Sequence, residues 1–124
     1  WGDDTLVCMN ESEHAWYIEH NFPVMAFTSQ AKGFYSKLIS GNEKSLSEKA
    51  RHRFLSERNL ALVPEVRALS EELGVSAAAV VIAYLTSQKN PTIAIAGSSR
   101  VEQIVDTLSA RDTTLSEEQM AALL

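Results

Sequence analysis

The segment TIAIAGSSRVEQIVDT, residues 92–107, decides the fold class of this chain. Its first five residues form a short apolar run, which is typical of a strand buried on both faces in a parallel sheet. A helix is predicted from about residue 101 to residue 109. Its apolar positions repeat at helical spacing and are expected to face inward: Val101, Ile104, Val105 and Leu108. A strand that leads directly into a helix is the unit of parallel α/β sheets.

The junction between this strand and this helix predicts an anion site. Gly97 allows a ligand to approach the backbone closely, and the N–H groups of the first helical turn have no intrahelical acceptor. Ser98 and Ser99 add hydroxyl donors, and Arg100 adds a planar fork that fits two phosphate oxygens. Together these features indicate a phosphate site at a helix N-terminus. A serine-capped helix beside a surface arginine is the competing interpretation.

A second apolar run, PVMAFT at residues 23–28, predicts another buried strand. The loop that follows it carries hydroxyl groups, Lys32 and Gly33. Because the carboxyl ends of parallel strands meet at one edge of the sheet, both loops are expected at the same ligand-binding edge. Core packing of Phe27 and a solvated surface charge at Lys32 are the alternatives.

Helical patterns fill the rest of the chain, so the predicted fold is helix-rich α/β with two parallel strands visible. Capping boxes are expected at residues 10–13 and 45–48, and residues 34–42 are predicted to be irregular. Two parallel strands cannot form a self-sufficient core. The expected helices span residues 11–20, 46–56, 64–73, 77–85, 101–109 and 116–124.

Composition excludes several classes of protein. With 11 Lys and Arg against 16 Asp and Glu among 124 residues, and no block of like charge, a nucleic-acid partner is not expected. No apolar run approaches the ~20 residues of a membrane span. Cys8 is the single cysteine and no signal-peptide pattern is present, which predicts a cytoplasmic location. His14 and His20 lie six residues apart, a spacing that predicts no metal site.

Four segments, in order along the chain, resemble the aldo-keto reductases. Residues 25–34 resemble the family's seventh strand, and residues 93–103 its eighth strand and cofactor loop. Residues 75–85 are similar to the helix between those strands, and residues 115–119 to the start of the final helix. The resemblance implies a (β/α)₈ TIM barrel that binds NADPH and reduces aldehydes and ketones without a metal. With no initiator Met before Trp1, residues 1–124 are expected to be the C-terminal fragment of one such barrel domain.

The resemblance also implies roles for the two loops. Phe27 takes the place of the aromatic residue that stacks on the nicotinamide, and residues 28–33 would lie along the pyrophosphate. Residues 97–100 would hold the phosphate of the adenosine ribose, and Arg100 favours NADPH over NADH. The implied cofactor site comprises Phe27, Thr28, Ser29, Gln30, Ala31, Lys32, Gly33, Gly97, Ser98, Ser99, Arg100, Gln103, Asp106 and Thr107.

The chain departs from the family pattern in three ways that bear on function. The usual Glu-Asn pair beside the adenine appears as Asp106-Thr107, and the usual aromatic Tyr appears as Phe27. The family's catalytic Asp, Tyr, Lys and His come from earlier strands, and no segment here matches those motifs. The catalytic residues are therefore expected outside this chain, and the chain alone is expected to be inactive on small carbonyl compounds. The alternative is a non-catalytic, reductase-derived module that self-associates or binds a partner through unpaired strand edges.

Overall fold

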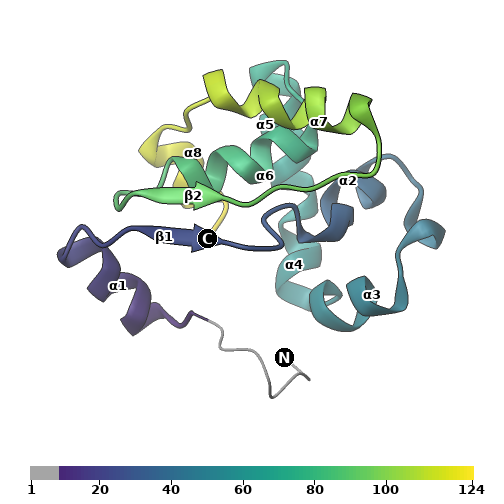
Figure 1. Cartoon of the computed structure of the whole chain (residues 1–124). Helices are drawn as coiled ribbons and strands as arrows, with labels where there is room; N and C mark the ends of the chain where they lie inside the picture. Colours follow the sequence, from purple (N-terminus) through teal and green to yellow (C-terminus); the bar gives the residue numbers. More distant parts are fainter. Residues whose placement is uncertain (1–8) are drawn as a thin grey trace.

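The computed structural model describes residues 9–124, so Cys8 lies outside the described residues. It is a helix-rich α/β arrangement around two parallel strands, β1 (Val24–Ala26) and β2 (Thr92–Ala94) (Figure 1). Val24 pairs with Thr92 and Ala26 with Ala94. The two predicted parallel strands are confirmed, although each is shorter than the apolar run that predicted it.

Local capping signals place most of the helices. Asn10 accepts a hydrogen bond from the Glu13 N–H at 2.9 Å, and Glu13 accepts one from the Asn10 N–H at 3.0 Å. Gly74 adopts φ 65°, the left-handed conformation that ends a helix after its last turn. The α-helices in the described range are α1 (Glu11–Glu19), α2 (Phe34–Ile39), α3 (Glu48–Phe54), α4 (Glu57–Ala61), α5 (Val63–Leu73), α6 (Ala77–Thr86), α7 (Val101–Leu108) and α8 (Glu117–Ala122).

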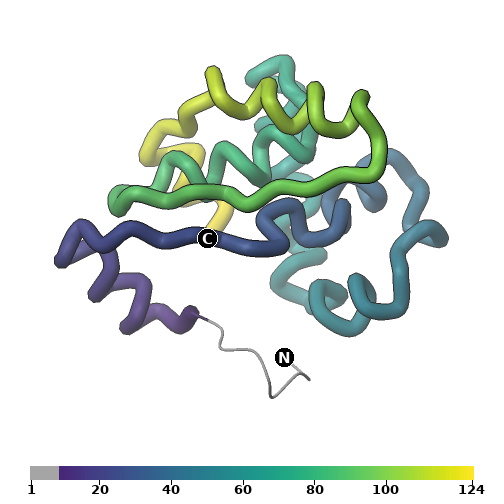
Figure 2. Tube along the Cα trace, in the orientation of Figure 1, coloured from purple at the N-terminus to yellow at the C-terminus, as the bar shows by residue number. Residues whose placement is uncertain are grey.

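Helix α6 is the centre of the core. It packs against α5, α7 and β2, and it runs along the helix-covered side of the sheet (Figure 2). Val80 and Ala83 are fully buried, and Val66 and Leu69 of α5 pack beside them. The almost entirely apolar sequence of residues 77–85 accounts for this packing on several sides. Across residues 9–124 no single helix has the length and apolarity to cross a bilayer, and residues 57–73 and 77–86 have both only as a pair bent by 95°.

The prediction that residues 34–42 are irregular was wrong, because Phe34–Ile39 form α2. Phe34 is fully buried against Leu46 and Ala50, and α2 packs on α5 and α6. Tertiary burial therefore makes this segment helical, since tertiary context overrides weak local propensity.

The capping box expected at residues 45–48 was also misplaced. Ser47, not Ser45, caps α3 by accepting a hydrogen bond from the Ala50 N–H at 3.2 Å. Ser45 ends a 3₁₀ turn, Glu43–Ser45, and its hydroxyl donates to the carbonyl of Asn42 at 2.7 Å. The single helix predicted over residues 46–56 is therefore shorter, and the separate helix α4 follows it.

One face of the two-stranded sheet is open to solvent, so the prediction that both strands are buried on both faces was wrong. Side chains alternate along a strand, and only one set contacts the helices. The other set is between 46 % and 65 % exposed. We call this set the open sheet face; it comprises Met25, Phe27, Ile93 and Ile95.

The apolar stripe of α7 also faces outward rather than inward. Val101 is 72 % exposed, and Val105 and Leu108 are each 62 % exposed. Helix α7 instead turns its half-buried Asp106 and Thr107 toward α6 and the loop after β1, through side-chain hydrogen bonds. The sequence pattern identified the apolar face of α7 correctly, but the prediction that this face points inward was wrong.

Candidate functional site

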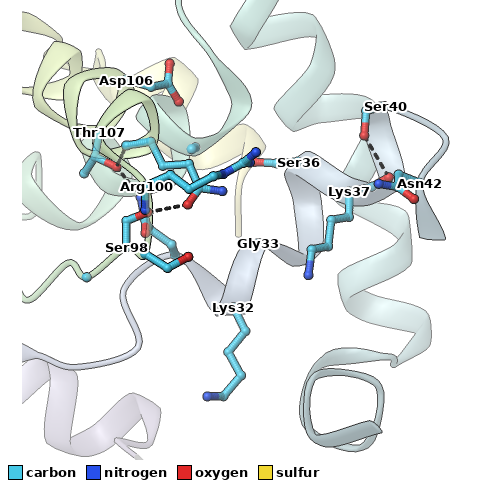
Figure 3. A pocket seen from close by; sticks show the side chains of 15 residues that line it. Lys32, Gly33, Ser36, Lys37, Ser40, Asn42, Ser98, Arg100, Asp106 and Thr107 are labelled. Carbon is cyan, nitrogen blue, oxygen red and sulfur yellow. Dashed lines mark hydrogen bonds between the residues drawn. The ribbon is translucent and has the colours of Figure 1, made fainter. Parts of the chain in front are cut away.

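The loops that follow β1 and β2 lie side by side and, with α2 and α7, surround a cavity of about 520 Å³ (Figure 3). Ser29 links the two loops directly, because its hydroxyl donates to the carbonyl of Ile95 at 2.7 Å. Ten of the fourteen predicted site residues line this cavity: Gln30, Lys32, Gly33, Gly97, Ser98, Ser99, Arg100, Gln103, Asp106 and Thr107.

The other four predicted residues lie beside the cavity rather than in its wall. Phe27 belongs to the open sheet face and is 56 % exposed. Ser29 is buried and holds the loops together. Thr28 and Ala31 shape the turn that brings the following residues to the cavity, since Ala31 donates to the Thr28 carbonyl at 2.9 Å.

The loop after β1 has an unusual backbone conformation. Thr28, Ala31 and Lys32 adopt φ values of 56°, 47° and 54°, and Gly33 follows at 74°. Each non-glycine residue in this region costs about 1–2 kcal/mol, and a β-branched residue such as Thr28 is a marked outlier. Strain of this kind is concentrated at functional sites, where it holds backbone groups in a fixed arrangement.

Thr28→Gly is expected to raise the free energy of unfolding by up to about 1 kcal/mol, because glycine adopts a positive φ without the steric cost. Urea denaturation followed by circular dichroism measures the change. Thr113→Gly is the matched control, because Thr113 has φ −109° and offers no such strain to release. Equal destabilisation by both substitutions would contradict the assignment of strain to Thr28.

The cavity is cationic, although the chain as a whole carries a formal charge of −5. Lys32, Lys37 and Arg100 line it, and Asp106 is the one acidic side chain among the described residues in its wall. The two lysines extend from the side of α2 and the loop after β1, while Arg100 and Asp106 belong to the α7 side (Figure 3). This charge balance favours a negatively charged ligand.

The corner between β2 and α7 is open for a ligand. A Cβ atom built on Gly97 would meet nothing within 4 Å. Arg100 is the N-cap residue of α7, and its side chain does not cap the helix. Ser98 donates to the side-chain oxygen of Gln103 and accepts from the Arg100 N–H at 3.4 Å. The arginine side chain therefore takes no part in capping α7, and it lines the cavity.

A family model described as the aldo/keto reductase family matches residues 9–123 of the chain. The chain belongs to the aldo/keto reductase family. Membership implies an oxidoreductase of the kind that uses a nicotinamide cofactor, and it confirms the resemblance found in four separate segments.

The sequence of this aldo/keto reductase chain did not reveal the α2 side of the cavity. Four of the missed residues fall in the segment predicted to be irregular. Ser36 and Ser40 are four residues apart and so lie on one helical face, a signal that becomes visible only once the helix is known. The missed lining residues are Ser36, Lys37, Ser40, Asn42 and Ala78.

None of the tyrosines among the described residues lines the cavity. Tyr35 lies on α2 but packs into the core, and its hydroxyl donates to the Asn59 side chain at 3.4 Å. Burial raises the pKa of Tyr35 above its ordinary value, an effect that nearby Arg58 partly offsets. Within residues 9–124, no group of three or more His, Cys, Asp or Glu side chains is arranged to hold a metal ion.

Proposed function

We propose that this chain forms the NADPH-binding part of an oxidoreductase that reduces aldehydes and ketones to alcohols. In this proposal residues 1–124 are the C-terminal portion of a (β/α)₈ barrel domain. The observation that carries the proposal is the convergence of two strand-end loops on one cationic cavity. When bound, NADPH supplies the hydride, and the protein supplies binding, orientation and electrostatics. The single cysteine supports a cytoplasmic location.

The side chains present fit a polyanionic dinucleotide. In the proposed arrangement Lys32 and the backbone of residues 28–33 lie along the pyrophosphate, and Arg100 holds the 2′-phosphate with its planar fork. Phe27 offers an exposed aromatic face to the nicotinamide from the open sheet face. Gln103 and Asp106 lie beside the adenine.

A titration of the 124-residue chain with NADPH, followed by nicotinamide fluorescence, tests the proposal. We expect weak binding that is tighter for NADPH than for NADH and that weakens with added salt. Binding should be weak because the loops lack part of the support that pre-organises them. Absence of any binding by folded chain would contradict the proposed function.

The same chain is expected to show no steady turnover of aldehydes with NADPH. Carbonyl reduction needs a proton donor at the carbonyl oxygen, which in this family is a tyrosine tuned by neighbouring groups. Tyr35 is half-buried against the core and does not line the cavity, and its raised pKa makes it a poorer acid. Loss of NADPH absorbance at 340 nm, measured against a blank without aldehyde, would overturn this expectation if it continued over many turnovers.

A second candidate function is that of a non-catalytic module that associates with another copy of itself. The open sheet face favours this candidate, because its apolar side chains and the outer strand edges remain available for contact. Multi-angle light scattering tests it, with Ile93→Lys as the disrupting variant. A monomer at all concentrations would exclude self-association.

A further inference from the structure

A hydrogen bond between two side chains joins the walls of the cavity. Gln30, in the loop after β1, donates from Nε2 to the hydroxyl oxygen of Thr107 on α7 at 2.5 Å. The two residues are 77 positions apart in the chain, and both line the cavity. We call this contact the loop–helix clamp. It is separate from the contact of Ser29 with the Ile95 carbonyl, which ties the same loop to the end of β2 and not to α7.

The direction of the loop–helix clamp follows from a second contact of Thr107. The Thr107 hydroxyl donates its single proton to the carbonyl of Gln103, one turn earlier on α7, at 2.7 Å. Its oxygen is then left to accept, so the Gln30 amide must present its NH₂ group to it. The protein therefore fixes the orientation of the Gln30 side chain by itself.

The loop–helix clamp holds a strained segment of backbone in place. Gln30 lies between Thr28 and Ala31, whose φ values are 56° and 47°. Backbone in this region keeps its conformation only where the surrounding contacts hold it. Lys32, also at a positive φ of 54°, follows two residues after Gln30. The position of Lys32 relative to α7 therefore depends on this clamp.

The loop–helix clamp also connects the two cationic sides of the cavity. Arg100 and Thr107 belong to the α7 side, and Lys32 belongs to the loop after β1 (Figure 3). A ligand that engages Lys32 and Arg100 together gains affinity when the protein already holds them at the right spacing. A ligand that engages Arg100 alone has no such requirement. Loss of the clamp should therefore affect only the bridging ligand.

We propose that Gln30 is a positioning residue that sets the spacing between the loop after β1 and α7, so that the cavity favours a polyanion that bridges both walls over a single phosphate group. This inference rests on the proposed function, in which the bridging polyanion is NADPH. Gln30 acts through Thr107, and the role requires no contact between Gln30 and the ligand.

The experiment titrates NADPH and adenosine 2′-monophosphate into the 124-residue chain and follows both by the NMR shifts of backbone amides. NADPH reaches both walls, whereas the monophosphate carries only the phosphate assigned to Arg100. Gln30→Leu removes the clamp with little change in side-chain volume. It should weaken NADPH binding about fivefold, the effect of losing one hydrogen bond of ordinary strength, and leave monophosphate binding unchanged. A general loss of structure would weaken both ligands alike.

Further variants test the mechanism. Thr107→Val removes the same hydrogen bond from its other end and should give the same loss, which keeps the test open if Gln30→Leu fails to fold. The double variant should lose no more than either single variant, because both remove one contact. Thr107→Ser retains the hydroxyl and should restore NADPH affinity. Gln88→Leu is the matched control, since the Gln88 amide donates to the Tyr84 carbonyl at 3.0 Å outside the cavity, and it should change neither affinity.

The outcomes distinguish the two proposals. If the unsubstituted chain binds neither nucleotide, the proposed function fails and this inference fails with it. If the chain binds NADPH and folded Gln30→Leu binds it equally well, the inference alone is overturned. An equal loss for both ligands in Gln30→Leu, or additive losses in the double variant, also overturns it.

Discussion

Arg100→Glu is expected to weaken NADPH binding about hundredfold while changing NADH binding by about twofold or less. The substitution removes a bidentate, charge-assisted contact to the 2′-phosphate and puts a negative charge in its place. NADH lacks that phosphate and so loses only the general attraction of the cationic cavity. Titrations of both nucleotides at one ionic strength measure the two changes.

Lys49→Glu is the matched control for this charge reversal. It makes the same change in net charge at an exposed position on α3 that does not line the cavity. Both nucleotides should then lose little affinity, because the altered charge lies in solvent and is screened. Equal losses of NADPH and NADH affinity in Arg100→Glu would remove Arg100 from the 2′-phosphate.

Phe34→Ala is expected to lower the free energy of unfolding by about 3–5 kcal/mol. Phe34 is fully buried, packs edge-on against Tyr35 and contacts Leu46 and Ala50. It also directly follows Gly33, so the cavity created by truncation would loosen the wall of the candidate site. Urea denaturation gives the stability change.

Phe22→Ala provides the comparison for that loss. Phe22 is 48 % exposed, and its ring contacts are with Trp16 and Tyr17 rather than with the core. Its truncation should cost about 1 kcal/mol or less, because little of its area is removed from water. Similar costs for both substitutions would show that Phe34 does not anchor the core.

The parts of the fold that were predictable from sequence are those determined within a few residues. Asn10, Ser76 and Ser116 cap helices through hydrogen bonds to a residue three positions away, and Gly74 ends α5 through its own backbone conformation. Such signals do not depend on distant contacts. The joining of the two strand-end loops followed from a general rule for parallel strands.

The parts that could not be predicted depend on contacts between distant segments. Helix α2 forms because Phe34 is buried against Ala50 of α3 and against Leu46, which lies just before α3. The sequence of residues 34–42 itself shows no helical periodicity. Lys37 and Ser36 could not be assigned to the cavity without that helix. Likewise the apolar stripes of the sheet and of α7 indicate surfaces for burial, but no pattern in these residues states which segment covers them.

The hydrogen bond between Ser29 and Ile95 joins residues 66 positions apart in the chain. Because closing so long a loop costs chain entropy, we expect this contact to form late in folding, after the helices between these residues. A ligand that binds in this cavity therefore binds the folded state and not the unfolded state. Its binding should therefore raise the melting temperature of the whole molecule, and the rise should continue with the logarithm of ligand concentration above the dissociation constant, which makes thermal unfolding a direct screen for cofactors.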